Sequence, residues 1–348
     1  MKHFSLFLVF FCLCLMPSGA YAAKNGEVIV YNWSDYIPED VLSAFTRETG
    51  IKVIYSTYEA NEIMHAKIKT LKGKGYDVVC PSTYVLEQMI DDGLIQALDH
   101  SKIPNLKNVD PKLMSQSFDP GNKHSMPYMW GNYSLIVNTK RAKQPVTAWQ
   151  DMLRPEFKNK VMIYNDLRMA FGMALLAVGL DPNATEEKDI AAGYDFLQKL
   201  RPSIRVFDVS AAARSMVSEE AIVGGIWNGD GQLAINENPD LTFVYPKEGA
   251  VLWLDSFAIT SGAANVDNAH AFINFMLRPE VAIRCLEEYG YSTANLAAQD
   301  LMDAELKNNR VLNPTEEDLK NAVMVRAVGP AQLIYNKYWE KLLANIEQ

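Results

Sequence analysis

The sequence lacks the short motifs that mark most catalytic and nucleotide-binding sites. It contains no G-x-S-x-G, H-E-x-x-H, C-x-x-C or Walker pattern. Histidine is scarce, at 5 residues in 348, and the four beyond the N-terminal segment are widely spaced. We therefore expect no enzyme activity, no metal site and no cofactor, although an exported hydrolase acting on an amine compound is a rival hypothesis. Surface positions are expected for the four histidines, His65, His100, His124 and His270.

Cysteine and long apolar runs are also scarce. After the N-terminal segment only Cys80, which ends a strand pattern, and Cys285, within a helical pattern, are present. Export would permit a disulfide, but these positions favour two buried free thiols. Beyond the N-terminus no stretch reaches about eighteen uninterrupted apolar residues, so no further membrane anchor is predicted.

The N-terminal segment has the pattern of a cleaved signal peptide. Lys2 precedes an apolar run over residues 6–15, and a small-x-small cleavage signal lies at 20–22. The run is too short for a comfortable membrane span, and no lipoprotein cysteine follows the small residues. We expect residues 1–22 to be removed and the mature protein to be soluble and periplasmic.

Acidic residues outnumber basic ones. The formal net charge of the sequence is −9, and loss of Lys2 would bring it to −10. This balance disfavours nucleic acid and anionic membrane surfaces as partners, and it is compatible with cationic ligands. We expect a monomer that binds no nucleic acid.

Strand and helix patterns alternate through both halves of the chain. Strands are predicted over 28–33, 52–58 and 76–80, each followed by a helical pattern, which is typical of a mostly parallel sheet. The extended stretch 128–138 is a candidate crossing into a second lobe, where the alternation resumes from residue 161. Because no long linker separates the halves, we predict an α/β protein with two lobes that form a hinged clamshell.

Aromatic residues and carboxylates recur together at predicted strand ends. In open α/β sheets the carboxyl ends of the strands form the ligand-binding edge. One such pair is more often structural than functional, but three pairs at matching positions favour a binding site. The pairs are Trp33 with Asp35, Trp227 with Asp230, and Trp253 with Asp255.

Several carboxylates that meet in an apolar, aromatic cleft repel one another and resist desolvation unless a cation enters. A charge-assisted hydrogen bond to an ammonium contributes about 1.5–3 kcal/mol. An aromatic face over the cation adds about 0.5–2 kcal/mol. The sequence therefore predicts a site for an alkyl chain with an amine at each end. Asp166, Ser82 and Tyr84 lie at further strand ends.

Long motifs in the same order resemble those of the periplasmic spermidine/putrescine-binding proteins that serve bacterial ABC importers. The resemblance runs from about Val28 to the C-terminal helix and includes YNWSDY at 31–36 and YDVVCPSTY at 76–84. It continues with GIWNGD at 225–230 and GYSTANLAA at 290–298. It implies a type II-like clamshell with a polyamine held in the interlobe cleft.

The resemblance also implies how the chain divides between the lobes. Residues 23–132 would form the first part of lobe 1, and residues 133–253 the first part of lobe 2. Residues 254–300 would return to lobe 1, and residues 301–348 would complete lobe 2. Composition and periodicity do not reveal this return.

Motif by motif, the resemblance implies a set of binding residues. Six aromatic side chains would form the walls: Trp33, Tyr36, Tyr84, Trp227, Trp253 and Tyr291. Asp35, Asp166 and Asp255 would take the ammonium groups, with Ser34 and Ser82 as polar support. Tyr291 is assigned from the resemblance alone, since its local sequence would otherwise predict a packed core tyrosine.

Three positions bear on the length of the ligand. Met169 stands where spermidine-type members have a glutamate, and Val325 stands where they have a glutamine, with a one-residue offset to Arg326 as the alternative. Asp230 resembles putrescine-type members. We therefore favour a putrescine-length ligand, with spermidine as the close alternative.

The partner implied by the resemblance is an inner-membrane ABC permease. The alternative is a membrane sensor on which the loaded receptor docks, because no motif identifies the docking surface.

Overall fold

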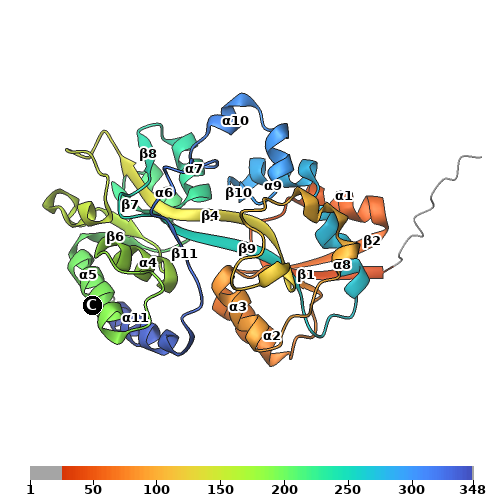
Figure 1. Ribbon diagram of the computed structural model, residues 1–348. Helices are drawn as coiled ribbons and strands as arrows, with labels where there is room; N and C mark the ends of the chain where they lie inside the picture. Colours follow the sequence, from red (N-terminus) through yellow and green to blue (C-terminus); the bar gives the residue numbers. More distant parts are fainter. Residues whose placement is uncertain (1–25, 347–348) are drawn as a thin grey trace, which may run out of the picture.

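Two long antiparallel strands run through the middle of the molecule and connect its two lobes (Figure 1). They are β4 (Ser125–Asn138) and β9 (Val251–Ile259), and both are almost entirely buried. The computed structural model describes residues 26–346, so the predicted signal peptide over 1–22 lies outside the described residues.

The first lobe is built on parallel strands at one end of the sheet. β1 (Gly26–Trp33) lies between β2 (Ile51–Tyr58) and β3 (Val78–Val79) and is parallel to both. β3 is shorter than the strand predicted over 76–80. The connecting helices each bury one face, as their apolar spacing predicts: α1 (Glu39–Thr49), α2 (Asn61–Thr70) and α3 (Thr83–Asp91).

The second lobe repeats this arrangement at the other end of the sheet. β5 (Val161–Ile163) lies between β6 (Ile204–Phe207) and β7 (Val223–Trp227) and is parallel to both. β8 (Leu241–Val244) pairs with β4. The helices of this part are α4 (Leu167–Ala177), α5 (Glu187–Leu200), α6 (Ala212–Val217) and α7 (Asn228–Glu237).

After β9 the chain returns to the first lobe. α8 (Val266–Met276) packs against β1 and β9, and α9 (Pro279–Tyr289) leads to β10 (Ser292–Thr293), which pairs with β4. The rings of Phe272 in α8 and Phe45 in α1 meet edge to face, with centroids 5.3 Å apart. This apolar contact joins segments that are far apart in the sequence.

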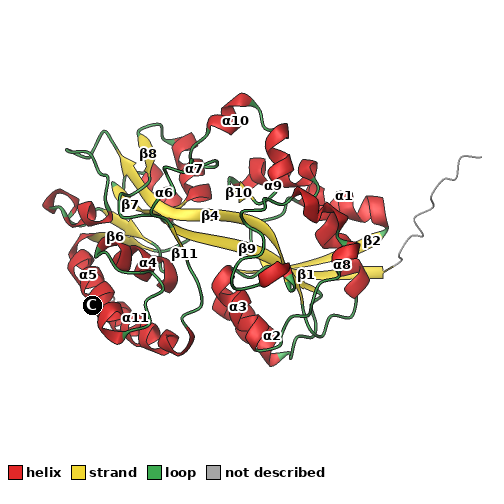
Figure 2. Cartoon of the chain, in the orientation of Figure 1, coloured by secondary structure: helices red, strands yellow, loops and turns green. Residues whose placement is uncertain are grey.

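The C-terminal segment runs back across the molecule. β11 (Val323–Met324) lies parallel to β9, and α11 (Gln332–Ile346) packs against α4 and α5 (Figure 2). Before that, Met302 and Leu312 belong to the same apolar cluster as Leu286 of α9. The lobe boundaries at 132/133, 253/254 and 300/301 stay a prediction.

Short helical turns occupy many of the connections. Within residues 26–346 these turns are the short α-helix α10 (Ala304–Asn308) and eight 3-10 helices. The latter are η1 (His100–Lys102), η2 (Pro104–Asn108), η3 (Pro120–Asn122), η4 (Trp149–Leu153), η5 (Pro155–Phe157), η6 (Arg201–Ser203), η7 (Leu296–Leu301) and η8 (Gly329–Ala331).

The sheet is mixed rather than mostly parallel. The pairs β1–β2, β1–β3, β5–β6 and β5–β7 are parallel, whereas β4 and β9 run antiparallel to each other. β4 is also antiparallel to β7, β8 and β10, and β9 is antiparallel to β3 but parallel to β11. Local strand–helix alternation predicts the parallel pairs, because each needs a helical crossover. It carries no information about strands that cross between lobes.

Cys80 and Cys285 are buried free thiols, which confirms the prediction that they form no disulfide.

His270 is buried, with 2% of its surface exposed, so the expected surface position is wrong for this residue. The backbone N–H of Asp99 donates to its Nε2, and its Nδ1 lies 2.8 Å from the carbonyl oxygen of Val266. Backbone partners therefore satisfy both ring nitrogens.

None of the helices in the described part of the chain has the length and apolar character needed to cross a membrane.

Candidate functional site

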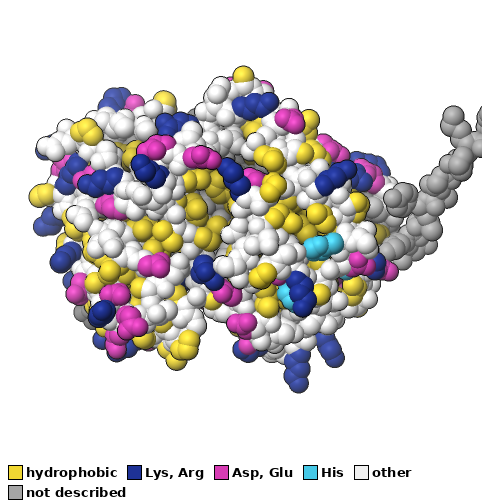
Figure 3. Space-filling view, in the orientation of Figure 1, with side chains coloured by type: hydrophobic (Ala, Val, Ile, Leu, Met, Phe, Trp, Pro, Cys, Tyr) yellow, Lys and Arg dark blue, Asp and Glu magenta, His cyan; other side chains and the backbone are white. Residues whose placement is uncertain are grey.

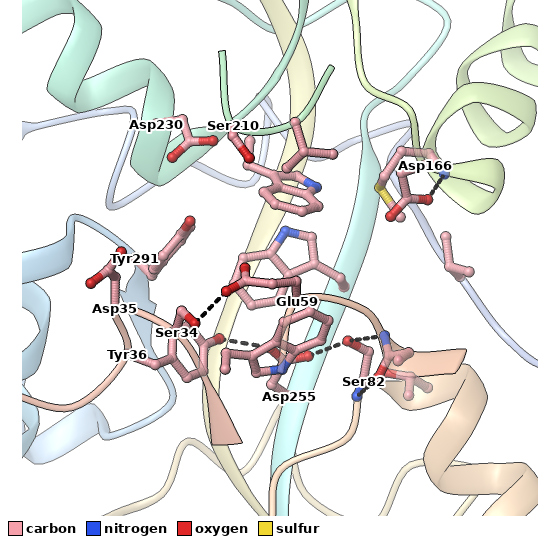
Figure 4. A pocket seen from close by; sticks show the side chains of 18 of the residues that line it. Ser34, Asp35, Tyr36, Glu59, Ser82, Asp166, Ser210, Asp230, Asp255 and Tyr291 are labelled. Atoms are coloured by element: carbon pink, nitrogen blue, oxygen red, sulfur yellow. Dashed lines mark hydrogen bonds between the residues drawn. The ribbon is translucent and has the colours of Figure 1, made fainter. Parts of the chain in front are cut away.

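A cavity of about 350 Å³ lies where the strand ends of the two lobes meet. The groove between the lobes is visible in the space-filling view (Figure 3), and its interior is drawn in Figure 4. All twelve predicted binding residues line this cavity. They are Trp33, Ser34, Asp35, Tyr36, Ser82, Tyr84, Asp166, Trp227, Asp230, Trp253, Asp255 and Tyr291.

The turn after β1 presents four consecutive side chains to the cavity. The indole N–H of Trp33 donates to the carbonyl oxygen of Cys80 at 3.0 Å, which fixes its ring beside Tyr58. Asp35 has a φ of 50°, a left-handed conformation that Asp tolerates better than most residues. Its carboxylate is exposed, so the turn places one open acidic group at the cavity.

Asp255 is the most deeply buried carboxylate of the site, with 4% of its surface exposed. The hydroxyl of Ser82 donates to its Oδ1 at 2.5 Å, and the phenol of Tyr36 donates to its Oδ2 at 2.7 Å. Burial raises the pKa of this carboxyl to about 7, although the two hydroxyl donors act in the opposite direction. The ionised form therefore lacks a compensating charge that a cationic ligand would supply.

A hydrogen-bond network holds the polar residues around β3. The amide nitrogen of Asn61 donates to Ser82 Oγ at 3.0 Å and to the Tyr84 hydroxyl at 3.2 Å. The Tyr84 hydroxyl in turn donates to Oε1 of Glu62 at 3.1 Å. Ser82 is thus oriented toward Asp255, and Tyr84 is held with its ring on the cavity wall.

In the second lobe, Asp230 lies in the first turn of α7, and this helix begins directly after Trp227. The hydroxyl of Tyr164 donates to its Oδ2, and the Tyr164 ring meets the Trp227 ring edge to face at 4.7 Å. Burial raises the pKa of Asp230 above its ordinary value. Aromatic and acidic groups thus occur together on this wall too.

Asp166 has a structural role in addition to its place in the cavity. It caps α4, because its Oδ1 accepts a hydrogen bond from the backbone N–H of Met169 at 2.9 Å. Burial raises the pKa of this carboxyl to about 6, while the helix N–H group opposes the shift. One of its oxygens is therefore already engaged by the protein.

Two glycines allow aromatic rings to approach the backbone closely. A Cβ atom at Gly131 of β4 would lie 2.5 Å from Cζ2 of Trp253, and one at Gly229 of α7 would collide with the ring of Tyr291. The Trp253 and Tyr291 rings meet each other edge to face, with centroids 5.5 Å apart. Gly229 lies in the GIWNGD motif at 225–230, but sequence reasoning assigned neither glycine a role.

Glu59 is a carboxylate of the site that sequence reasoning missed. It follows β2 directly and accepts a hydrogen bond from the hydroxyl of Ser34 at 2.5 Å. The rule that selects Asp35, a carboxylate after a strand, also applies to this residue.

The structure further places Val325, and not Arg326, on the cavity wall. The other lining residues are Asn61, Thr83, Met169, Val209, Ser210 and Ala213.

The cavity is strongly acidic. Within residues 26–346, no lysine or arginine forms an ion pair with any of its five carboxylates. The described residues also contain no cluster of three acidic, histidine or cysteine side chains suited to a metal ion. Figure 4 shows Asp35 and Asp230 on one side of the cavity beside Tyr291, and Asp166 on the other.

The family model described as bacterial extracellular solute-binding protein matches residues 40–313. The chain belongs to this family. It is therefore a solute-binding protein and not an enzyme, and the predicted two-lobed α/β fold is confirmed.

Named relatives give a closer comparison. The chain is 43% identical over 333 residues to the spermidine/putrescine-binding periplasmic protein of Escherichia coli, covering 95% of this chain and 96% of that protein. It is 36% identical over 356 residues to a putrescine-binding periplasmic protein of the same organism, covering 96% of each. A putative spermidine/putrescine ABC transporter structure from Listeria monocytogenes has a TM-score of 0.86 and 34% identity, covering 92% of this chain and 99% of that one.

Proposed function

We propose that the protein captures a polyamine in the cleft between its lobes and delivers it to an ABC importer. The observation that carries this proposal is Asp255, a buried carboxylate with two hydroxyl donors and no ion-pair partner among residues 26–346. An ammonium group would supply the missing charge. The aromatic rings around it would cover the methylene chain and face the cations.

The proposed roles follow the chemistry of each side chain. Asp35, Asp230 and Asp255 bind ammonium groups, with Asp166 and Glu59 as further acceptors. Ser34 and Ser82 orient the carboxylates that they contact. The aromatic walls are Trp33, Tyr36, Tyr84, Trp227, Trp253 and Tyr291.

The names of the relatives support the cellular setting that we propose. Those named above are called periplasmic or ABC transporter proteins. We infer that this chain works as a periplasmic monomer after removal of residues 1–22, that it docks on an inner-membrane permease, and that it binds no nucleic acid. Docking on a membrane sensor is the alternative output.

The preferred ligand length also remains a proposal. Asp35 and Asp230 lie on the same side of the cavity (Figure 4), and either can bind the second ammonium of a diamine whose first is held by Asp255. Met169 and Val325 offer no charge to a third ammonium. We therefore propose putrescine as the preferred simple polyamine, with spermidine as the close alternative.

Calorimetric titration with putrescine, spermidine, lysine and glycine betaine tests the proposal. We expect micromolar affinity for a polyamine, about −8 kcal/mol, and no measurable binding of betaine, because betaine cannot donate hydrogen bonds to the carboxylates. Absence of heat and of any thermal shift with both polyamines at millimolar concentration would refute the polyamine function.

A further inference from the structure

The end of the cleft at the start of α4 combines acidic groups with a buried cation. A second cavity of about 370 Å³ adjoins the first here. Asp166 and Glu59 line both cavities, and Glu62 lines the second. Arg168 follows two residues after Asp166, lines neither cavity and is 2% exposed. A ligand ammonium at this end is therefore attracted by carboxylates and repelled by a guanidinium.

Arg168 has no carboxylate partner of its own. Within residues 26–346 it forms no ion pair with an acidic side chain. Its Nη2 donates instead to Oδ1 of Asn183 at 3.0 Å and to the carbonyl oxygen of Arg326 at 3.1 Å. Because both acceptors are neutral, they orient the side chain without compensating its positive charge.

The guanidinium lies close to the cleft although it lines neither cavity. Its carbon atom is 5.9 Å from the centre of the Tyr84 ring, which forms part of both cavity walls, and 5.0 Å from the centre of the Tyr335 ring of α11. Burial raises the pKa of Asp166 to about 6, and the charge of Arg168 acts against that rise. Arg168 thus compensates part of the negative charge that Asp166 offers to a ligand.

We propose, resting on the proposed function, that Arg168 is a specificity-determining residue that favours a diamine over a triamine. Its positive charge acts through space and weakens the binding of a third ammonium at the α4 end, where carboxylates would otherwise hold it more tightly. A diamine that uses Asp35 or Asp230 keeps its second ammonium on the opposite side of the cavity from Asp166 (Figure 4). That ammonium is farther from Arg168 and is repelled less.

The size of the effect follows from Coulomb's law. At an effective dielectric constant of about 20, a unit charge at about 10 Å changes the affinity for a second charge about tenfold. Dissolved salt screens a buried charge such as Arg168 less than a charge on the surface. A neutral side chain in its place should therefore strengthen the binding of a triamine more than that of a diamine.

Calorimetry on the mature protein with putrescine and spermidine tests this inference at pH 8, where Asp166 is ionised. Arg168→Met preserves an extended side chain, and Arg168→Gln preserves a donor for the Arg326 carbonyl oxygen. Both remove the charge, and both should raise the ratio of spermidine affinity to putrescine affinity about tenfold. A neutral side chain avoids the cost of burying an unpaired charge, so we expect both variants to fold.

Two controls separate the charge from the structure. Arg205→Gln removes a positive charge from the surface of the second lobe, where Arg205 pairs with Glu220, and should leave the affinity ratio unchanged. Asn183→Ala removes a hydrogen-bond partner of Arg168 and keeps its charge, so it should lower stability without changing the ratio.

A change in the ratio below about threefold in both Arg168 variants overturns the inference, as does an equal change in Asn183→Ala. If the unmodified protein binds putrescine and spermidine in that case, only the role of Arg168 is lost. If it binds neither polyamine, the proposed function itself fails, and the role of Arg168 fails with it.

Discussion

At the scale of single residues, the site depends on burying a carboxylate without burying its counter-ion. Asp255 lies between Ser82 and Tyr36, and both oxygens are held by hydroxyl groups from the first lobe. Its geometry is thus set before any ligand arrives, while its charge stays uncompensated. Asp35, by contrast, is exposed in a turn and keeps much of its hydration.

We expect Asp255→Asn to weaken polyamine binding by about 2–5 kcal/mol, because it breaks a buried charge pair. Asp35→Asn should have a smaller effect, since water screens an exposed carboxylate. Calorimetric titration of both variants measures the difference. Asp40→Asn, on the outer surface where Asp40 pairs with Arg284, is the control and should leave affinity unchanged. A change of less than about twofold for Asp255→Asn would remove it from the site.

The raised pKa of Asp255 predicts that affinity depends on pH. An ammonium ligand binds the ionised carboxylate, so affinity should fall about tenfold per pH unit below pH 7 and level off above it. Titrations from pH 5 to pH 8 in buffers with different ionisation enthalpies would also count the released protons. The profile should flatten in Asp255→Asn, and a flat profile in the unmodified protein would contradict the assignment.

The raised pKa of Asp255 acts in the opposite direction on the folding stability of the ligand-free protein, which decreases as the pH rises. The folded state holds the Asp255 proton more tightly than the unfolded chain, where the pKa is about 4. This group therefore stabilises the fold at low pH, and its contribution is lost as the pH rises through about 7. The stabilisation produced by ligand should accordingly grow over this range.

At the scale of secondary-structure elements, the aromatic walls depend on close backbone approach. Trp253 of β9 lies over Gly131 of β4, and Tyr291 lies against Gly229 in the first turn of α7. Asn228 ties that turn to the sheet, since its Oδ1 accepts from the backbone N–H of Asn132 at 3.3 Å. The positions of the Trp253 and Tyr291 rings therefore depend on the backbone of neighbouring elements, and not only on the segments that carry these residues.

Gly229→Ala should displace the Tyr291 ring and weaken polyamine binding about tenfold or more, equivalent to about 1.4 kcal/mol. Titration and thermal unfolding of the same sample separate an effect on the site from general instability. Gly179→Ala is the matched control, because its φ of 75° strains an alanine while no atom lies near the added Cβ. It should lower stability without changing affinity, and an equal loss of affinity in both variants would refute the specific role of Gly229.

At the scale of the whole molecule, two strands and the C-terminal segment connect the lobes. β4 and β9 run through both. The carboxylate of Glu87 in α3 accepts hydrogen bonds from the backbone N–H of Ala327 at 3.1 Å and from Nη2 of Arg326 at 3.4 Å. Ligand that contacts both lobes adds to these connections and should favour the closed form.

A polyamine at about one hundred times its dissociation constant should stabilise the native state by about 2.7 kcal/mol. For a chain of this size, that corresponds to a rise in melting temperature of about 4 °C. Thermal unfolding monitored by tryptophan fluorescence measures the shift, and Trp33, Trp227 and Trp253 should report binding directly. A betaine control should shift neither signal, and an equal shift with betaine would argue against recognition by carboxylates.

Local sequence was enough to predict much of this architecture. Strand–helix alternation predicted the three parallel strands of the first lobe, with β3 shorter than expected, and the restart of the alternation at residue 161, where β5 begins. These signals are local. Pairs of an aromatic residue and a carboxylate marked Asp35, Asp230 and Asp255. The expected position at a strand end is wrong for Asp255, which lies inside β9 (Val251–Ile259). The same rule should have included Glu59.

Only the tertiary structure decided how these residues meet. Asp255 reaches Tyr36 across 219 positions and Ser82 across 173, because β9 returns beside β3 in an antiparallel direction that local periodicity does not encode. The burial that raises its pKa belongs to that packing, as do the close approaches at Gly131 and Gly229. Residue types and spacing determined which groups are available for cation binding. The pairing of distant strands determined which of them lose their water, and desolvation is what makes an isolated carboxylate favour a cation.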